Sequence, residues 1–154
     1  MPNLLVSFYI TQQRTDPFGQ RVWDDGLAEN YRTSRRVKGE DGIFRTVPVP
    51  PDWYRVASLN PTQVGAVSEA IDAAAVDQIP AEITAVEEGS DDISSAVWEI
   101  RTPEGVRTIR VAQWGPLDPA AKPLMDLLMR MTTVVNLAAA GLDSVPASNN
   151  TDGN

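Results

Sequence analysis

The stretch that decides the fold reads SAVWEIRTPEGVRTIRV and occupies positions 95–111. At its centre, Pro103-Glu104-Gly105 combines residues that favour a tight turn. On both sides apolar and polar residues alternate with the period of two that a half-buried strand shows. The stretch therefore predicts a β-hairpin, with strands over Ser95–Thr102 and Val106–Trp114. The side chains expected to face the core are Trp98, Ile100, Ile109 and Val111.

Two amphipathic segments on either side of this hairpin predict helices. The first begins at Asn60, a good capping residue, with Pro61 at the first helical position and Gln63 where a capping box requires it. We expect it to end near Asp77 and Pro80. The second starts at either Asp118-Pro119 or Lys122-Pro123 and stops at Gly141. The apolar stripes are Val64, Val67, Ile71 and Ala74 or Ala75 in the first, and Leu124, Leu127, Leu128, Met131, Val134, Val135 and Ala138 in the second.

Ahead of the first helix the sequence predicts strands. Leu4–Gln13 alternates clearly, and after a turn at residues 15–19 there are three short extended candidates. These candidates are Gln20–Trp23, Tyr31–Val37 and Ile43–Val49. Three prolines, Pro48, Pro50 and Pro51, cannot donate ladder hydrogen bonds, so a strand through them must lie at a sheet edge or stop. Ile83–Val86 is a further short strand candidate, and residues 87–92 are expected to form an acidic loop.

Together these elements predict an α+β fold, an antiparallel sheet with two helices packed on one face. The chain has 154 residues, of which 42% are hydrophobic, which suits one packed core. We expect residues 1–141 to form that single domain. Residues 142–154 are rich in Ser, Asn, Asp and Gly and are expected to form a disordered C-terminal tail.

The charge of the chain argues against nucleic acid as a partner. The formal net charge is −8, with +1 in residues 1–56 and −9 in residues 57–154, and binding to phosphates needs an excess of clustered Lys and Arg. The early apolar run Leu4–Ile10 is too short to span a membrane, so we expect a cytoplasmic protein with no membrane partner. The oligomeric state is left open.

The chain contains no histidine and no cysteine. It therefore has no Ser-His-Asp triad, no thiolate nucleophile and no His or Cys ligands for zinc. We expect no catalytic residues, no cofactor and no metal. One enzymatic alternative remains, a small carboxylate-based hydrolase or cation-binding protein that uses Asp24, Asp25, Asp91 or Asp92; the plainer interpretation is that these adjacent acids are solvated.

Aromatic residues, prolines and basic residues gather between the first strand and the first helix. Phe18, Trp23, Trp53 and Tyr54 are candidate apolar anchors for a protein partner, and Arg35 and Arg36 are candidates to orient it by charge-assisted hydrogen bonds. The competing interpretation is that the rings pack in the core and the arginines pair within the chain.

Three segments resemble the emfourin-like proteins, small inhibitors of thermolysin-like metalloproteases. The segments are Leu59–Gln63 opening a helix, the hairpin pair Val97–Ile100 and Arg107–Val111, and Pro119–Leu128. This chain departs from the family in one respect. The Gly-Gly stretch that the family has after the first strand is missing, and a long insertion over residues 15–52 replaces it. The resemblance implies a non-catalytic protein-interaction module whose partner is a metalloprotease. The alternatives are a structural or assembly subunit of an oligomer and the carboxylate-based protein described above.

Overall fold

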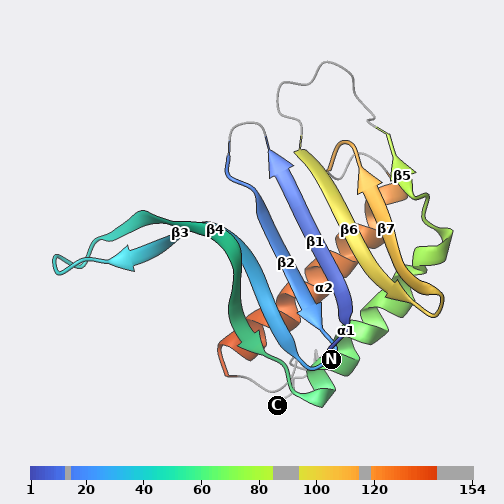
Figure 1. The fold of residues 1–154 in the computed structure, drawn as a ribbon, viewed down its shortest axis with the longest axis horizontal. Coiled ribbons are helices and arrows are strands. Elements are labelled where there is room, and N and C mark those ends of the chain that lie inside the picture. The colour runs from blue at the N-terminus through green and yellow to red at the C-terminus, as the bar shows by residue number, and fades with distance from the viewer. Residues whose placement is uncertain (13–14, 85–93, 115–118, 142–154) are drawn as a thin grey trace, which may run out of the picture.

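A computed structural model describes residues 1–12, 15–84, 94–114 and 119–141. These residues form an α+β fold with a seven-stranded sheet and two α-helices (Figure 1). The elements in chain order are β1 (Leu4–Gln12), β2 (Phe18–Trp23), β3 (Leu27–Lys38), β4 (Phe44–Ser58), α1 (Pro61–Ala74), η1 (Val76–Gln78), β5 (Glu82–Ile83), β6 (Ser94–Thr102), β7 (Gly105–Val111), η2 (Pro119–Ala121) and α2 (Lys122–Ala139).

The sheet has the strand order β4-β3-β2-β1-β6-β7-β5. Neighbouring strands are antiparallel except β5, which pairs with β7 in parallel, so the expectation of a purely antiparallel sheet is wrong at this edge. The reason is the path of the chain. After α1 the chain returns to the edge of the sheet, and there β5 runs in the same direction as β7. Backbone bonds from the Arg110 N–H to the Ala81 carbonyl and from the Ala112 N–H to the Ile83 carbonyl fix this pairing.

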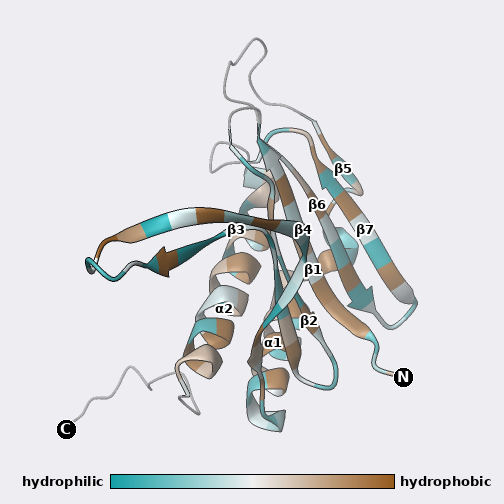
Figure 2. Cartoon of the chain, turned by 60° about the vertical axis from the view of Figure 1, so that its left-hand side comes forward, coloured by the Kyte–Doolittle hydropathy of each residue, from teal (hydrophilic) through white to brown (hydrophobic). Residues whose placement is uncertain are grey.

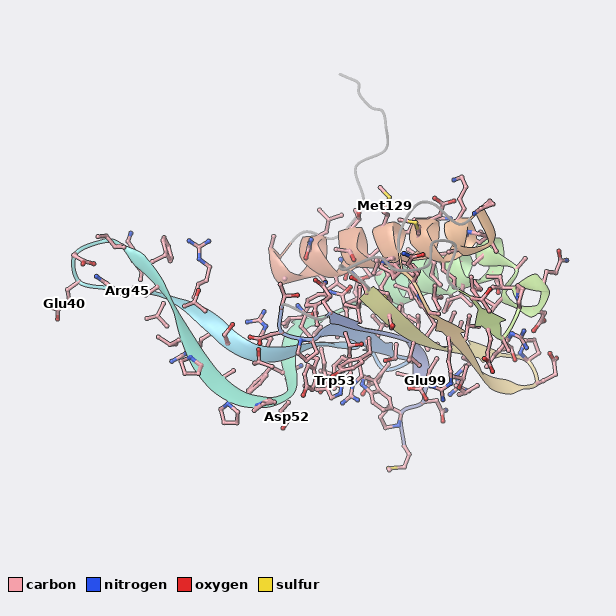
Figure 3. The ribbon with its side chains drawn as sticks, turned by 90° about the horizontal axis from the view of Figure 1, so that it is seen from above. Glu40, Arg45, Asp52, Trp53, Glu99 and Met129 are labelled. Carbon is pink, nitrogen blue, oxygen red and sulfur yellow. The ribbon has the colours of Figure 1, made fainter. Side chains whose placement is uncertain are left out.

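Both helices lie against the same face of the sheet, and the opposite face is open (Figures 1 and 3). The core between the layers is built around Trp98, which is fully buried and lies 4.8 Å from the ring of Phe8. All four side chains expected to face the core from the central hairpin are buried, as are most positions of the two helical stripes. The buried stripe residues are Val67, Ile71, Ala74, Leu124, Leu127, Met131, Val134 and Val135.

Helix α1 begins as the sequence predicts. The Asn60 side chain accepts a hydrogen bond from the backbone N–H of Gln63, and the Gln63 side chain accepts one from the N–H of Asn60. The helix ends earlier than expected, because Ala75 adopts a left-handed conformation with φ 49° and a short 3₁₀ turn follows. Helix α2 starts at Lys122, one of the two predicted starts, after a 3₁₀ turn that begins at Pro119.

The segment before α1 is more regular than its sequence suggests. The separate candidates Tyr31–Val37 and Ile43–Val49 are parts of one long hairpin, β3–β4, and β4 continues to Ser58. Strand β4 carries the three prolines and is one of the two edge strands of the sheet, as predicted for a strand through them. Val86, the acidic residues 87–92 and the tail 142–154 lie outside the described residues. Among the described helices, none is both long enough and apolar enough for a membrane crossing.

Candidate functional site

The outer half of the β3–β4 hairpin leaves the body of the molecule (Figures 1 and 3). Arg32 pairs with Asp52, but the next registered pair is Ser34 with Pro48, so three residues of β4 face Thr33 alone. This bulge at residues 49–51 bends the hairpin. We call it the elbow, and we call residues 33–51 the arm. The Thr33 hydroxyl donates to a carboxylate oxygen of Asp16 at 2.7 Å, which ties the start of the arm to the body.

The end of the arm exposes large apolar side chains. Val37 is 36% exposed, Ile43 56% and Phe44 53%, and Figure 2 shows hydrophobic residues close to the tip. The guanidinium of Arg36 lies over the Phe44 ring, 4.9 Å from its centre. Across the turn, Arg45 donates to Asp41 at 2.7 Å, and this bond holds the pKa of the Asp41 carboxyl below its ordinary value. The tip is thus an ordered turn with an apolar surface and charged flanks.

A groove of about 480 Å³ lies at the elbow. Three arginines and an aromatic ring contribute to it, with the valines and prolines of β4 between them. The Tyr54 hydroxyl donates to the Pro50 carbonyl at 2.6 Å and so fixes the bulge against its own strand. The lining residues are Arg32, Arg35, Val47, Pro48, Val49, Pro50, Tyr54 and Arg55. We call this feature the elbow groove.

On the open face, three rings from three different strands form a cluster. Tyr9 and Tyr31 meet edge to face with centroids 5.2 Å apart, and Tyr31 and Trp53 meet similarly at 5.5 Å. Gly19 lies among them: a Cβ there would come within 2.8 Å of the Trp53 indole, so the missing side chain is what lets the ring lie on the sheet. Burial and the neighbouring Tyr31 raise the pKa of the Tyr9 hydroxyl. We call Tyr9, Tyr31 and Trp53 the aromatic platform.

An arginine connects the aromatic platform to Trp23. The guanidinium of Arg21 lies 4.2 Å from the centre of the Trp53 ring and 5.2 Å from that of Trp23. Its Nε donates to Glu29 at 2.7 Å, and the Trp23 indole N–H donates to the same carboxylate oxygen at 2.8 Å. These contacts hold two tryptophans and an ion pair in a fixed arrangement beside the start of the arm.

The structure places the six predicted partner-binding residues in four different positions. Trp23 and Trp53 share Arg21 on the open face, whereas Arg35 and Tyr54 line the elbow groove. Arg36 lies farther out, stacked on Phe44. Phe18 is 44% exposed at the start of β2 and pairs with Ile10, a core residue, so alternation places it on the opposite sheet face from the aromatic platform.

Several residues of this surface were not predicted. The period-two alternation of β1 gives the signal for Tyr9, because Val6, Phe8 and Ile10 define the core face and Tyr9 must then point away from it. No comparable sequence signal identifies Arg21 and Glu29 as a pair, since their contact depends on the register between β2 and β3.

The acidic residues of the enzymatic alternative have structural contacts where they are described. Asp24 accepts from the backbone N–H of Asn3 at 2.9 Å, which lowers the pKa of its carboxyl, and Asp25 accepts from the N–H of Leu27. Asp91 and Asp92 lie outside the described residues. In the part of the chain that the structure describes, no group of three acidic side chains is arranged to hold a metal ion.

These features, an arm, a groove and an aromatic platform, are the candidate functional surface of the chain. Comparisons with protein-family models, with curated proteins and with solved structures found no match.

Proposed function

We propose that the protein is a non-catalytic interaction module that holds a partner protein with the arm and the adjoining aromatic platform. The observation that carries this proposal is the arm itself. A two-stranded hairpin outside a sheet is only marginally stable in water, and exposed apolar side chains at its end gain stability only when something covers them. Ile43 and Phe44 are therefore the proposed anchors at the tip.

The partner-binding residues predicted from the sequence would add a second set of contacts to those made by Ile43 and Phe44. Trp23 and Trp53 would offer flat, partly exposed rings, and Tyr54, Arg35 and Arg36 would bind along the elbow and the arm. Phe18 would contact a partner only if the partner also reached around the end of β2.

The resemblance to emfourin-like inhibitors supports a thermolysin-like metalloprotease as the partner. The direct test is to titrate the purified protein into thermolysin and to follow cleavage of a peptide substrate. We expect inhibition by the unaltered chain and at least tenfold weaker inhibition by the variant Ile43→Ser with Phe44→Ser. A full rate at saturating protein would remove the inhibitor assignment.

The wider proposal is tested by a photo-crosslinking residue placed at position 43, with position 106 as the matched control. Val106 is 50% exposed on the turn of the β6–β7 hairpin, away from the arm. We expect a defined protein to be captured at position 43 and not at position 106. Equal capture at both positions, or none at position 43, would show that the tip of the arm is not a binding element.

A second candidate function is assembly into an oligomer, and the outer surface of the helices favours it. A groove of about 680 Å³ runs between α1 and α2; alanines line it on the α1 side, and Leu127, Met129 and charged side chains line it on the α2 side. Met129 is 69% exposed and points away from the sheet (Figure 3). Size-exclusion chromatography with light scattering tests this candidate: a monomer at high concentration would exclude it, and a dimer that Met129→Glu dissociates would support it.

A further inference from the structure

We propose that the elbow groove binds a carboxylate-bearing segment of the partner protein, held by Arg32, Arg35 and Arg55. This inference rests on the proposed function and adds the chemistry by which the partner is recognised. Among the residues that the structure describes, these three cationic side chains and no acidic one line the groove. None of the three arginines forms an ion pair within the described part of the chain.

The acidic residues close to the elbow are already engaged with other donors. Glu29 lies opposite Arg55 in the ladder, but its Oε1 accepts from both Arg21 and Trp23. Asp52 lies opposite Arg32 and accepts from the backbone N–H of Trp53 at 2.7 Å. None of these carboxylates forms an ion pair with a groove arginine in the described part of the chain, so the three guanidinium groups keep N–H donors for a ligand.

Asp16, the remaining nearby acid, accepts from Thr33 at 2.7 Å. Of the three arginines, Arg55 donates to the Ser58 hydroxyl, which is a neutral partner and leaves the guanidinium charge uncompensated. A guanidinium forms its strongest hydrogen bonds with planar anions, and a carboxylate can accept two of its N–H groups side by side.

The distribution of charge over the molecule favours an acidic polypeptide over other anions. The arm, residues 33–51, carries four Arg or Lys and two Asp or Glu, a net +2, so the remainder of this −8 chain carries −10. A long polyanion such as nucleic acid would be repelled by that remainder, whereas a short acidic segment can enter the groove alone.

The walls of the groove suit a polypeptide because they are apolar and fixed. Val47 and Val49 offer aliphatic surface between the arginines, and the two prolines restrict the backbone. The hydrogen bond from Tyr54 to Pro50 holds the bulge in place before any ligand arrives. A site formed in advance loses little conformational entropy on binding.

The test uses the full chain, labelled with ¹⁵N, and a blocked short peptide in which Asp and Leu alternate. The same peptide with Asn in place of Asp is the matched ligand control. We expect amide shifts concentrated at residues 32–35 and 47–55 with the Asp peptide only. Arg32→Gln and Arg35→Gln should each weaken binding about tenfold, since each removes charge-assisted hydrogen bonds.

Arg110→Gln is the matched protein control, because it removes the same charge from an exposed position on β7, which is far from β4 in the strand order and outside the groove. We expect it to weaken binding less than about twofold, the size of a screened long-range effect. An equal loss for Arg110→Gln and Arg35→Gln, or no shift at the elbow at all, would overturn the proposal. So would displacement by inorganic phosphate at the concentration of the peptide, which would indicate a general anion site.

The two proposals can fail separately. If crosslinking at position 43 captures a partner and Arg32→Gln and Arg35→Gln leave that capture unchanged, the elbow assignment is wrong and the interaction module stands. If the Asp peptide binds at the elbow but position 43 captures nothing, the groove is a peptide site and the tip of the arm is not a partner-binding element.

Discussion

The inner part of the β3–β4 hairpin and the arm are continuous pieces of the same two strands, but they bury very different amounts of side chain. Ala28 and Ala57 on the inner part are buried against the helices, whereas Ile43 and Phe44 at the end of the arm are more than half exposed. The difference comes from what lies beneath each part, because α1 and α2 do not extend under the arm (Figures 2 and 3). The body is therefore constrained by packing against the helices, whereas the arm is held by its own ladder and side-chain hydrogen bonds.

The largest expected effect lies in the body. Trp98→Ala removes a fully buried ring that touches Phe8 and leaves a cavity, which should lower the free energy of unfolding by about 3–5 kcal/mol. Urea denaturation followed by circular dichroism measures this, with Phe44→Ala as the comparison. A similar cost for both variants would mean that the arm is packed in solution.

Gly19→Ala tests the surface where the body meets the arm. The new Cβ would approach the Phe8 carbonyl oxygen to 2.9 Å as well as the Trp53 ring, so backbone must shift, at a cost of about 1–3 kcal/mol. The NMR signal of the Trp53 indole N–H should move with it. Gly65→Ala is the control, since it lies in α1 with open space around it and should be neutral or stabilising.

Asn60→Ala removes the cap that begins α1, directly after β4 returns to the body. The loss of the Asn60 side-chain bond to the Gln63 N–H should cost about 1 kcal/mol. Asn60→Ser, which can still cap, should recover most of it. If Asn60→Ala and Asn60→Ser unfold at the same urea concentration, the capping box contributes nothing to stability.

The arm is expected to contribute very little to stability. Ile43→Ser combined with Phe44→Ser should change the free energy of unfolding by less than about 0.5 kcal/mol, as exposed substitutions usually do. The same variant should inhibit thermolysin at least tenfold more weakly, so binding and stability separate. A marked drop in the denaturation midpoint would show that the tip is covered within the molecule.

The smallest effect concerns pH. The hydrogen bond from Asn3 holds the pKa of Asp24 below its ordinary value of 3.8. The ionised carboxylate therefore stabilises the folded state above the unfolded pKa, and this contribution is lost as pH falls through the lower folded pKa. Asp24→Asn should accordingly be less stable than the unaltered protein near neutral pH, and the difference should shrink in acid. Thermal unfolding scans at several pH values measure it; a difference that grows on acidification would contradict it.

Local signals in the sequence predicted most of the body. The Asn60 capping box, the turn at Pro103-Glu104-Gly105 and the apolar stripes each depend on residues close together in the chain. The parallel pairing of β5 was missed, because a two-residue strand carries no periodicity and its partner is set by the path of the chain after α1.

The candidate surface was predicted only in part, for a related reason. Trp23 and Trp53 can be identified in the sequence because they are large rings. The position of the Arg21 side chain between them cannot, because it depends on the β2–β3 and β3–β4 registers. The exposure of the arm could not be predicted from the sequence. Alternating residues predict a strand, but they do not indicate whether a helix packs against that strand. Exposure of Phe44 is thus a property of the assembled fold.

The prolines of β4 have a consequence for how the protein behaves when concentrated. A free strand edge normally offers its amide hydrogens to identical chains, which is how fibrils begin to grow. Pro48, Pro50 and Pro51 have no such hydrogens, and the bulge at residues 49–51 interrupts the regular ladder on this edge strand. The chain can therefore keep a hairpin extended into solvent while denying other copies a continuous template for stacking.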